Sequence, residues 1–334
     1  MKSVVLIHPP FYDNDTENSL LKPMFTNRDP EIQIKSFSWT LALFSSYRVL
    51  HIHWIEHLVG APTIPKSLGK AMLSMFLYFR VLASGIVIVN TRHNLRPHSR
   101  INNPFSRIVF FLWENRISTQ IVMNQHELTS TKPTKYLIPH PIYTIQNFDK
   151  TCYKRLNGTE RQYYIHFGRM DSNRQIAELI KSFGASVKDA NLLLVGEVPN
   201  RGYLTKILAL ATCFPSVYVI PEKIRLSELE SLIQNSTGVI GPLNDYHNSG
   251  VLFHALSHRK PILTRETATS RELQSELSDS LIHLDIDPSS PSSILRFVAA
   301  SKESSLNQSF ETFIAKRQPI EFFRKHVSLY KEII

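Results

Sequence analysis

HFGRMDSNRQIAELIKSF, residues 166–183, is the stretch of this sequence that decides the fold. It continues a short apolar run, Tyr163–Phe167, that predicts a buried strand, and it ends in a pattern that predicts a helix over 173–184. Gly168 and a basic loop separate the two. A strand followed by a short loop and a helix is the repeating unit of doubly wound parallel sheets. In these sheets ligands bind beyond the carboxyl ends of the strands.

Two arginines, Arg169 and Arg174, lie five positions apart in this loop. Two guanidinium groups at a strand–helix turn can bind a diphosphate and stabilise the charge that develops on it when it leaves. The alternative is a surface loop that carries two solvated arginines. The stretch on its own leaves both interpretations open.

The alternation of strands and helices continues on both sides of this stretch. Before it, strands are predicted at 4–7, 47–54, 86–90, 120–123 and 136–138, and helices at 66–84 and 104–117. After it, strands are predicted at 191–195, 217–220, 238–240, 261–263 and 281–284, and helices at 202–213, 226–234, 250–257 and 270–277. A polar segment, 144–162, divides the two sets. We therefore predict an α/β protein with two Rossmann-like domains, 1–150 and 151–317, and a terminal amphipathic helix at 318–334.

Composition narrows the compartment and the class of protein. The chain has 334 residues, of which 43% are hydrophobic and 20% charged, as in ordinary globular proteins. Its two cysteines, Cys152 and Cys213, exclude a disulfide framework and a cysteine-rich metal site. The first residues, MKSVVLIH, are too short for the apolar core of a signal peptide, and no apolar run is long enough for a spanning helix. We expect a cytoplasmic protein, either soluble or peripherally attached to a membrane.

The formal net charge is +10, and the surplus lies mainly in the first half of the chain. Residues 1–150 hold 16 of the 38 Lys and Arg but only 9 of the 28 Asp and Glu. A basic half favours a polyanionic partner, which is a nucleic acid, an anionic membrane or a phosphorylated substrate. Charge alone does not choose among these.

A second stretch, GPLNDYHNSGVLFHALSHRKPILT at 241–264, carries another phosphate-site pattern. Asn248, Ser249 and Gly250 directly precede a predicted helix. Backbone N–H groups at a helix start bind phosphate, and small residues let the ligand approach closely. The alternative is an ordinary Asn/Ser helix cap.

In this order the two stretches resemble the C-terminal half of GT-B fold glycosyltransferases, in particular the family-four-like group that builds bacterial surface polysaccharides. That group carries G-R-x5-K, for which this chain has Gly168, Arg169 and, at the lysine position, Arg174, with four residues between the two arginines. It also carries a closing G-K-P-V segment, matched by Arg259–Ile262. The resemblance implies that the C-terminal domain binds the diphosphate of a nucleotide sugar. The binding residues would be Arg169, Arg174, Tyr246, Asn248, Ser249 and Gly250.

The departures from the group are also informative. Its two glutamates, eight positions apart, are replaced here by Tyr246 and His254. The local form Y-x-N-S-G resembles a divergent branch with β-mannosyl- and glucuronosyl-type transferases, which favours an inverting reaction. Backbone groups of the loop with Pro221, Lys223 and Ile224 are expected to contact the base, a mode of contact that does not distinguish UDP from GDP.

The N-terminal half would supply the acceptor side. His93 matches the histidine of the family's T-x-H-[DN] segment, and His53, Trp54 and His98 are the candidate acceptor contacts. An inverting transferase needs a general base, for which Glu56 is the first candidate and His93 the second. The alternative for Glu56 is an exposed loop carboxylate. The group works without a bound metal, so the resemblance implies no metal and no cofactor beyond the donor itself.

Residues 66–84 and 104–117 predict apolar helices with basic edges, which include Lys66, Lys70, Arg80 and Arg107. Such helices can lie in a membrane interface, or they can pack on the N-terminal sheet. By the same resemblance, the terminal helix at 318–334 would cross back to the N-terminal domain.

The sequence thus predicts a glycosyltransferase that moves a sugar from a UDP- or GDP-sugar to a saccharide or lipid-linked acceptor in surface polysaccharide assembly. A sugar-nucleotide epimerase of the same fold and a non-catalytic partner subunit are the alternatives. Nucleic acid is not an expected partner, because it would leave both phosphate-site patterns without a role.

Overall fold

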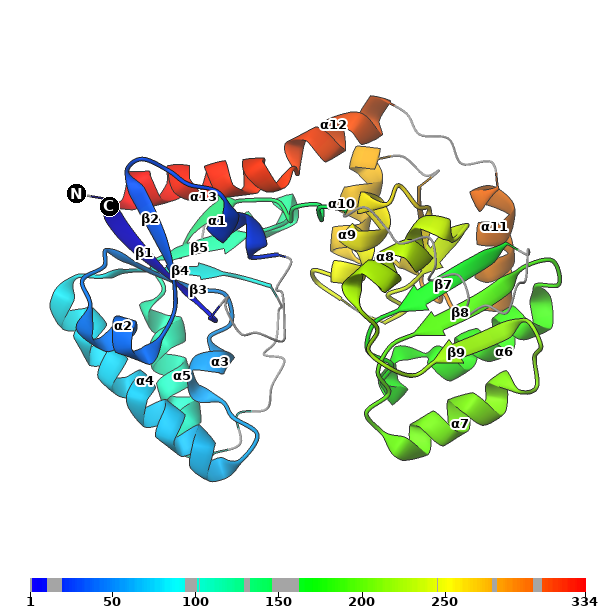
Figure 1. The fold of residues 1–334 in the computed structure, drawn as a ribbon, viewed down its shortest axis with the longest axis horizontal. Helices are drawn as coiled ribbons and strands as arrows, with labels where there is room; N and C mark the ends of the chain where they lie inside the picture. The colour runs from blue at the N-terminus through cyan, green and yellow to red at the C-terminus, as the bar shows by residue number, and fades with distance from the viewer. Residues whose placement is uncertain are drawn as a thin grey trace. The chain divides into compact units, whose positions relative to one another are not determined.

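The computed structural model describes residues 2–10, 20–93, 101, 103–128, 133–145, 162–244, 246–277, 281–302 and 308–334. The chain divides into two compact units (Figure 1). The N-terminal unit consists of residues 1–141 and 317–334, and the C-terminal unit of residues 142–316. The predicted boundary at 150 lies outside the described residues, and the unit division falls at 141.

Each unit contains its own parallel sheet of six strands. The N-terminal sheet has the order β2-β1-β3-β4-β5-β6, with β1 at Ser3–His8, β2 at Ile32–Ser36, β3 at Val49–Ile52, β4 at Val87–Thr91, β5 at Thr119–Val122 and β6 at Thr134–Leu137. The C-terminal sheet has the order β12-β11-β10-β7-β8-β9, with β7 at Tyr163–Phe167, β8 at Asn191–Val195, β9 at Val217–Ile220, β10 at Gly238–Ile240, β11 at Ile262–Arg265 and β12 at Ile282–Asp285. These two doubly wound sheets confirm the predicted α/β fold.

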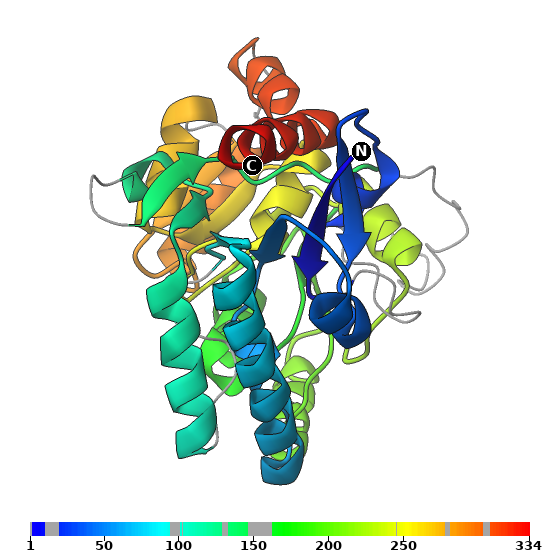
Figure 2. The same cartoon turned by 90° about the vertical axis from the view of Figure 1, so that its left-hand side faces the viewer.

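In the N-terminal unit the helices cover both faces of the sheet. Residues of β1 alternate between them, since Val5 and Ile7 pack under one layer and Leu6 under the other. The first layer contains α1 (Lys22–Thr26) and α13 (Pro319–Ile333). The second contains α2 (Trp39–Phe44), α3 (Glu56–Val59), α4 (Ile64–Ser84) and α5 (Pro104–Arg116). Figure 2 shows α4 and α5 side by side, with α13 on the opposite side of the sheet.

The C-terminal sheet is covered in the same way. Ile165 and Phe167 of β7 face one core, whereas Tyr164 faces the other. The first core is closed by α8 (Leu226–Asn235), α9 (Gly250–Ser257), α10 (Ala268–Leu277) and α12 (Gln308–Lys316). The second is closed by α6 (Ile176–Ser186), α7 (Arg201–Ala211) and α11 (Pro291–Ser301).

Two local differences from the sequence predictions have clear physical reasons. The helix predicted at 173–184 begins at Ile176, because Gln175 has a left-handed backbone (φ 56°) that interrupts the helical path. A short 3-10 turn, η3 at Ser172–Arg174, precedes it. The strand β2 was not predicted at all. It has only five residues and a single sheet neighbour, β1, so its sequence IQIKS carries little of the apolar signal of a central strand.

Candidate active site

The strand order of the C-terminal sheet defines where a ligand can bind. The chain leaves β7 towards β8 on one side and returns to β10 on the other, so the order reverses between β7 and β10. Beyond the carboxyl ends of two such strands the loops diverge and leave a crevice. The loop after β7 carries Arg169, and the loop after β10 leads into α9. Both predicted phosphate-site patterns therefore lie at the same switch point.

The loop after β7 is held by backbone hydrogen bonds to the end of β8 and the loop that follows it. The N–H of Gly168 donates to Val195 O at 3.0 Å, and that of Met170 donates to Glu197 O at 2.9 Å. Arg169 Nε lies 2.9 Å from Asp171 Oδ2, and the Arg169 side chain is 60% exposed. An anion can reach this guanidinium from solvent. Arg174 ends η3 and is partly buried, so both arginines belong to one short loop.

The amino end of α9 is the second part of the candidate phosphate site. Ser249 is the N-cap residue, but its hydroxyl makes no capping hydrogen bond. Its carbonyl oxygen accepts from Leu252 at 3.1 Å, so the first amides of the helix, at Gly250 and Val251, point out of the helix end. A Cβ on Gly168 would lie 3.7 Å from Val251 Cγ2, which places the β7 loop directly against this helix end. Asn248 precedes the cap and is partly buried.

Tyr246 and the loop expected to contact the nucleotide base have different surroundings. The Tyr246 hydroxyl accepts a hydrogen bond from Thr264 Oγ1 at 3.2 Å, and burial raises its pKa. The side chain thus anchors the loop before α9 to β11. Pro221, Lys223 and Ile224 follow β9, at the edge of the sheet. Lys223 is exposed, whereas Ile224 packs against the core.

His166 is a residue at the switch point that the sequence analysis did not single out. Its Nδ1 donates to Ile240 O at 2.7 Å and so joins β7 to the end of β10. Burial lowers the His166 pKa to about 4, so the ring is neutral at neutral pH. A Cβ on Gly241 would lie 2.7 Å from this nitrogen. The sequence signal that could have found it is its position two residues before Gly168-Arg169.

In the N-terminal unit a cavity of about 190 Å³ opens at the carboxyl ends of β3 and β4. Its lining includes His53, Trp54, Glu56 and His93, which are four of the residues that the sequence analysis assigned to catalysis or acceptor binding. The fifth, His98, lies outside the described residues. Glu114 of α5 also lines the cavity and is a second carboxylate that the sequence analysis missed, because helix periodicity marks it only as a surface position.

The rings around this cavity form an ordered stack. His93 stacks on Trp54 with ring centroids 4.3 Å apart and an interplanar angle of 20°. His93 Nε2 lies 2.8 Å from His53 Nδ1, within hydrogen-bond distance. Burial lowers the pKa of His53, and its buried neighbours His51 and His93 lower it further. A flat aromatic wall beside polar groups is the surface that sugars bind.

Glu56 begins α3 and is 6% exposed, which contradicts the alternative of an exposed loop carboxylate. His51, by contrast, has a structural position. It lies 2.6 Å from the Tyr330 hydroxyl through Nδ1 and 2.7 Å from Thr91 Oγ1 through Nε2, and it is fully buried. The contact with Tyr330 fastens α13 to the N-terminal sheet.

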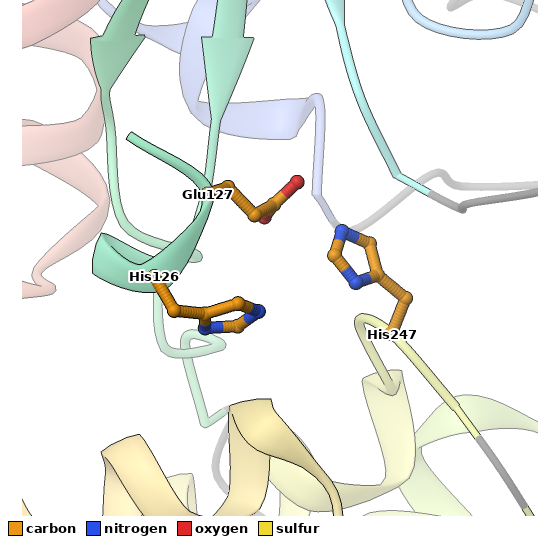
Figure 3. A group of neighbouring side chains, drawn as sticks. All are labelled: His126, Glu127 and His247. Carbon is orange, nitrogen blue, oxygen red and sulfur yellow. The ribbon is translucent and has the colours of Figure 1, made fainter. Parts of the chain in front are cut away.

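Further polar side chains lie on the loops of the two units. His126 and Glu127 belong to η1 (Gln125–Glu127), the short turn after β5 (Figure 3). Asn124 Nδ2 donates to Glu127 Oε1 at 3.0 Å. His247 lies on the loop that leads to α9 (Figure 3), where its carbonyl oxygen accepts from Thr269 Oγ1 at 2.8 Å. His140 Nδ1 lies 2.7 Å from Pro141 O, which indicates a backbone-bound side chain.

The two sheets and the position of their loops define the GT-B fold, and solved structures show it directly. The Anabaena protein HepE, solved in complex with UDP, matches with a TM-score of 0.67 and 11% identity over 99% of this chain and 100% of its own. Sucrose-phosphate synthase from Thermosynechococcus elongatus matches with a TM-score of 0.69 and 13% identity, over 100% of this chain and 99% of its own. At such identities these likenesses establish the fold alone.

Sequence similarity to a curated protein indicates the class of reaction. The chain is 22% identical over 273 residues to the GDP-mannose:glycolipid 4-β-D-mannosyltransferase of Xanthomonas campestris pv. campestris, a match that covers 81% of this chain and 76% of the relative. No family model matches the chain. Fold and sequence together support a glycosyltransferase that uses a nucleotide sugar. Among the described helices, none combines the length and apolarity that a membrane span requires.

Proposed function

We propose that this protein is an inverting glycosyltransferase that transfers a hexose from a nucleotide diphosphate to a saccharide or lipid-linked saccharide in surface polysaccharide assembly. The observation that carries the proposal is the convergence of the Arg169 loop and the amino end of α9 at the switch point of the C-terminal sheet. We take GDP-mannose as the donor, because the Xanthomonas relative is named for it.

The chemistry follows from the residues at the two sites. In the C-terminal unit, Arg169, Arg174 and the amides of Gly250 and Val251 would bind the diphosphate and stabilise its charge as the bond to the sugar breaks. In the N-terminal unit, the Glu56 carboxylate would take the proton of the acceptor hydroxyl. The oxygen would then attack the anomeric carbon, and the nucleoside diphosphate would leave. The arginines and the helix end replace the charge of a metal ion in this scheme.

The outer face of α4 supports membrane attachment of the same enzyme. The helix packs on the sheet through Ala71, Leu77 and Val81, yet its opposite face is apolar and exposed, at Ile64, Leu68, Met72, Leu73, Phe76, Phe79 and Leu82. The neighbouring helix α5 adds exposed Ile108 and Phe111. We call these nine side chains the apolar face. A contiguous apolar surface of this kind indicates an interaction site.

Exposed Lys66 and Arg107 lie on the same two helices, so the occupant we propose for the apolar face is an anionic membrane. Arg80 does not contribute to this charge. Its guanidinium donates to the carbonyl oxygens of Ala42 and Ser45 and is turned towards α2. A membrane that holds the lipid-linked acceptor would bring it to the N-terminal unit.

The donor site is tested by calorimetric titration of GDP and UDP into the purified protein and into Arg169→Ala. We expect roughly micromolar binding of GDP, weakened about 10- to 100-fold in the variant because a charge-assisted contact is lost. Arg271→Ala is the matched control, since Arg271 is another exposed arginine of the same unit that pairs with a nearby carboxylate, Glu266. Failure of both nucleotides to bind, or equal binding by both variants, would overturn the donor site.

A further inference from the structure

Three side chains of the C-terminal unit gather outside the residues used above. Glu230 lies on α8, His254 lies on α9, and His258 is the C-cap residue that directly follows α9. One potential ligand atom of each lies within 4.8 Å of the other two. The N–H of His258 donates to His254 O at 3.1 Å, so the two histidines lie one turn apart at the carboxyl end of α9. The three groups thus converge from two neighbouring helices.

The ring of His258 is oriented as metal-binding histidines usually are. Its Nδ1 lies 3.0 Å from Gln234 Oε1, one turn along α8 from Glu230. With Nδ1–H donating to this oxygen, Nε2 carries the lone pair. A hydrogen bond from the far ring nitrogen fixes both the tautomer and the direction of a histidine ligand.

The ring of His254 is held by stacking. It lies nearly parallel to Tyr143 at a centroid distance of 3.9 Å and an angle of 17°, and the Phe167 ring is perpendicular to it with a centroid distance of 6.1 Å. Its Nδ1 is buried and has no hydrogen-bond partner among the described residues. A fixed imidazole with an unused nitrogen is poised to bind a ligand.

The burial of the three side chains and their donor atoms suit a metal ion. Glu230 is 2% exposed and His258 is 3% exposed, whereas His254 is half-buried and leaves access from solvent. Two imidazoles and a carboxylate form a donor set typical of zinc, with water in the fourth position.

We propose that Glu230, His254 and His258 bind a divalent transition-metal ion, zinc foremost, which ties α9 to α8. Ligand atoms around tetrahedral zinc lie about 3.3 Å apart, at bond lengths near 2 Å, so small side-chain rotations close the site. The ion would stabilise the helix whose amino end carries the candidate phosphate site. The ion takes no part in the proposed sugar transfer.

The experiment uses the full-length protein, stripped with EDTA and dialysed. ZnCl2 is titrated by calorimetry, and CoCl2 is added in parallel to record the visible absorption of tetrahedral cobalt. We expect one equivalent of zinc with a Kd of about 1 µM or lower, and a rise in Tm of several degrees at saturation.

His254→Phe is the decisive variant because phenylalanine keeps the stack on Tyr143 and removes the ligand nitrogen. We expect its metal-free Tm to match that of the wild type, while zinc affinity falls at least about 100-fold and the zinc-dependent rise in Tm disappears. His258→Gln is the second ligand variant, and exposed His57→Ala is the control that keeps full affinity. The proposal is overturned if the wild type binds neither ion, or if His254→Phe and His258→Gln bind zinc as the wild type does.

Discussion

A Cβ atom on Gly196 would lie 1.8 Å from the carbonyl oxygen of Gly168. Gly196 also has φ +149°, a conformation that residues with side chains rarely adopt. The loops after β7 and β8 therefore meet backbone against backbone. This contact sets the position of Arg169, the residue that follows Gly168, and makes Gly196 a structural requirement of the candidate phosphate site.

Gly196→Ala should accordingly displace the β7 loop. We expect the free energy of unfolding of the C-terminal unit to fall by more than about 2 kcal/mol, because backbone must move to admit the methyl group. Nucleotide binding should be lost in the protein that still folds. Gly202→Ala is the control: it lies in α7 with its nearest atom at 3.4 Å, so alanine should be neutral or stabilising in urea unfolding. Equal stabilities of the two variants would contradict the loop contact.

Glu56→Gln tests the proposed general base. The amide keeps the shape of the side chain but cannot accept the acceptor proton, so we expect the rate of mannosyl transfer to a glycolipid acceptor to fall about 100-fold or more. GDP binding should be unchanged, since Glu56 belongs to the N-terminal unit. Glu114→Gln is the matched control, because Glu114 lines the same cavity. If Glu114→Gln abolishes transfer while Glu56→Gln is active, the assignment is wrong.

Buried histidines predict a loss of stability at mildly acidic pH. Burial lowers the His326 pKa to about 4, although its hydrogen bond to Phe322 O opposes the shift. Above pH 6.5 the ring is neutral in both states and the stability is fully present. As the pH falls from 6.5 towards 4, the unfolded chain binds the proton first, and stability is lost by up to about 3 kcal/mol.

This pH dependence is measured by urea unfolding at pH 7.5 and pH 5.0. His326→Leu removes one titrating group, so the difference in unfolding free energy between the two pH values should shrink by about 2 kcal/mol. His57→Ala, a substitution of an exposed histidine of the same unit, is the control variant. A His326→Leu protein with the wild-type pH dependence would show that this ring does not titrate as described.

The apolar face of α4 predicts binding to anionic vesicles. The protein should float with vesicles of phosphatidylcholine and phosphatidylglycerol, and less with phosphatidylcholine alone, because Lys66 and Arg107 favour negative lipid. The double variant Phe76→Ser, Phe79→Ser removes two of the most exposed rings and should stay at the bottom of the gradient. Far-ultraviolet circular dichroism checks that it is folded. If the wild type does not rise with either lipid, the membrane proposal fails.

Much of the fold was predictable from local pattern. Strands such as Tyr163–Phe167 and Asn191–Val195 are continuous apolar runs because both faces of a parallel sheet are covered, and the structure has them at the predicted bounds. The short helices α1, α2 and α3 were not predicted, because four to six residues do not complete the periodicity that marks a helix. The hydrogen bond between Thr264 and the Tyr246 hydroxyl was not predictable from local pattern either, because the two residues are 18 positions apart in the sequence.

The sequence by itself determined the α/β class, the two sets of alternating elements and the loops that carry Arg169 and Ser249-Gly250, because each depends on short-range periodicity and turn chemistry. Only the tertiary structure decided which distant side chains meet. It pairs His51 with Tyr330, 279 residues away, and stacks His254 on Tyr143. The physical reason is that parallel strands join only through long crossovers, so contacts between their ends depend on strand order, which residue spacing does not encode.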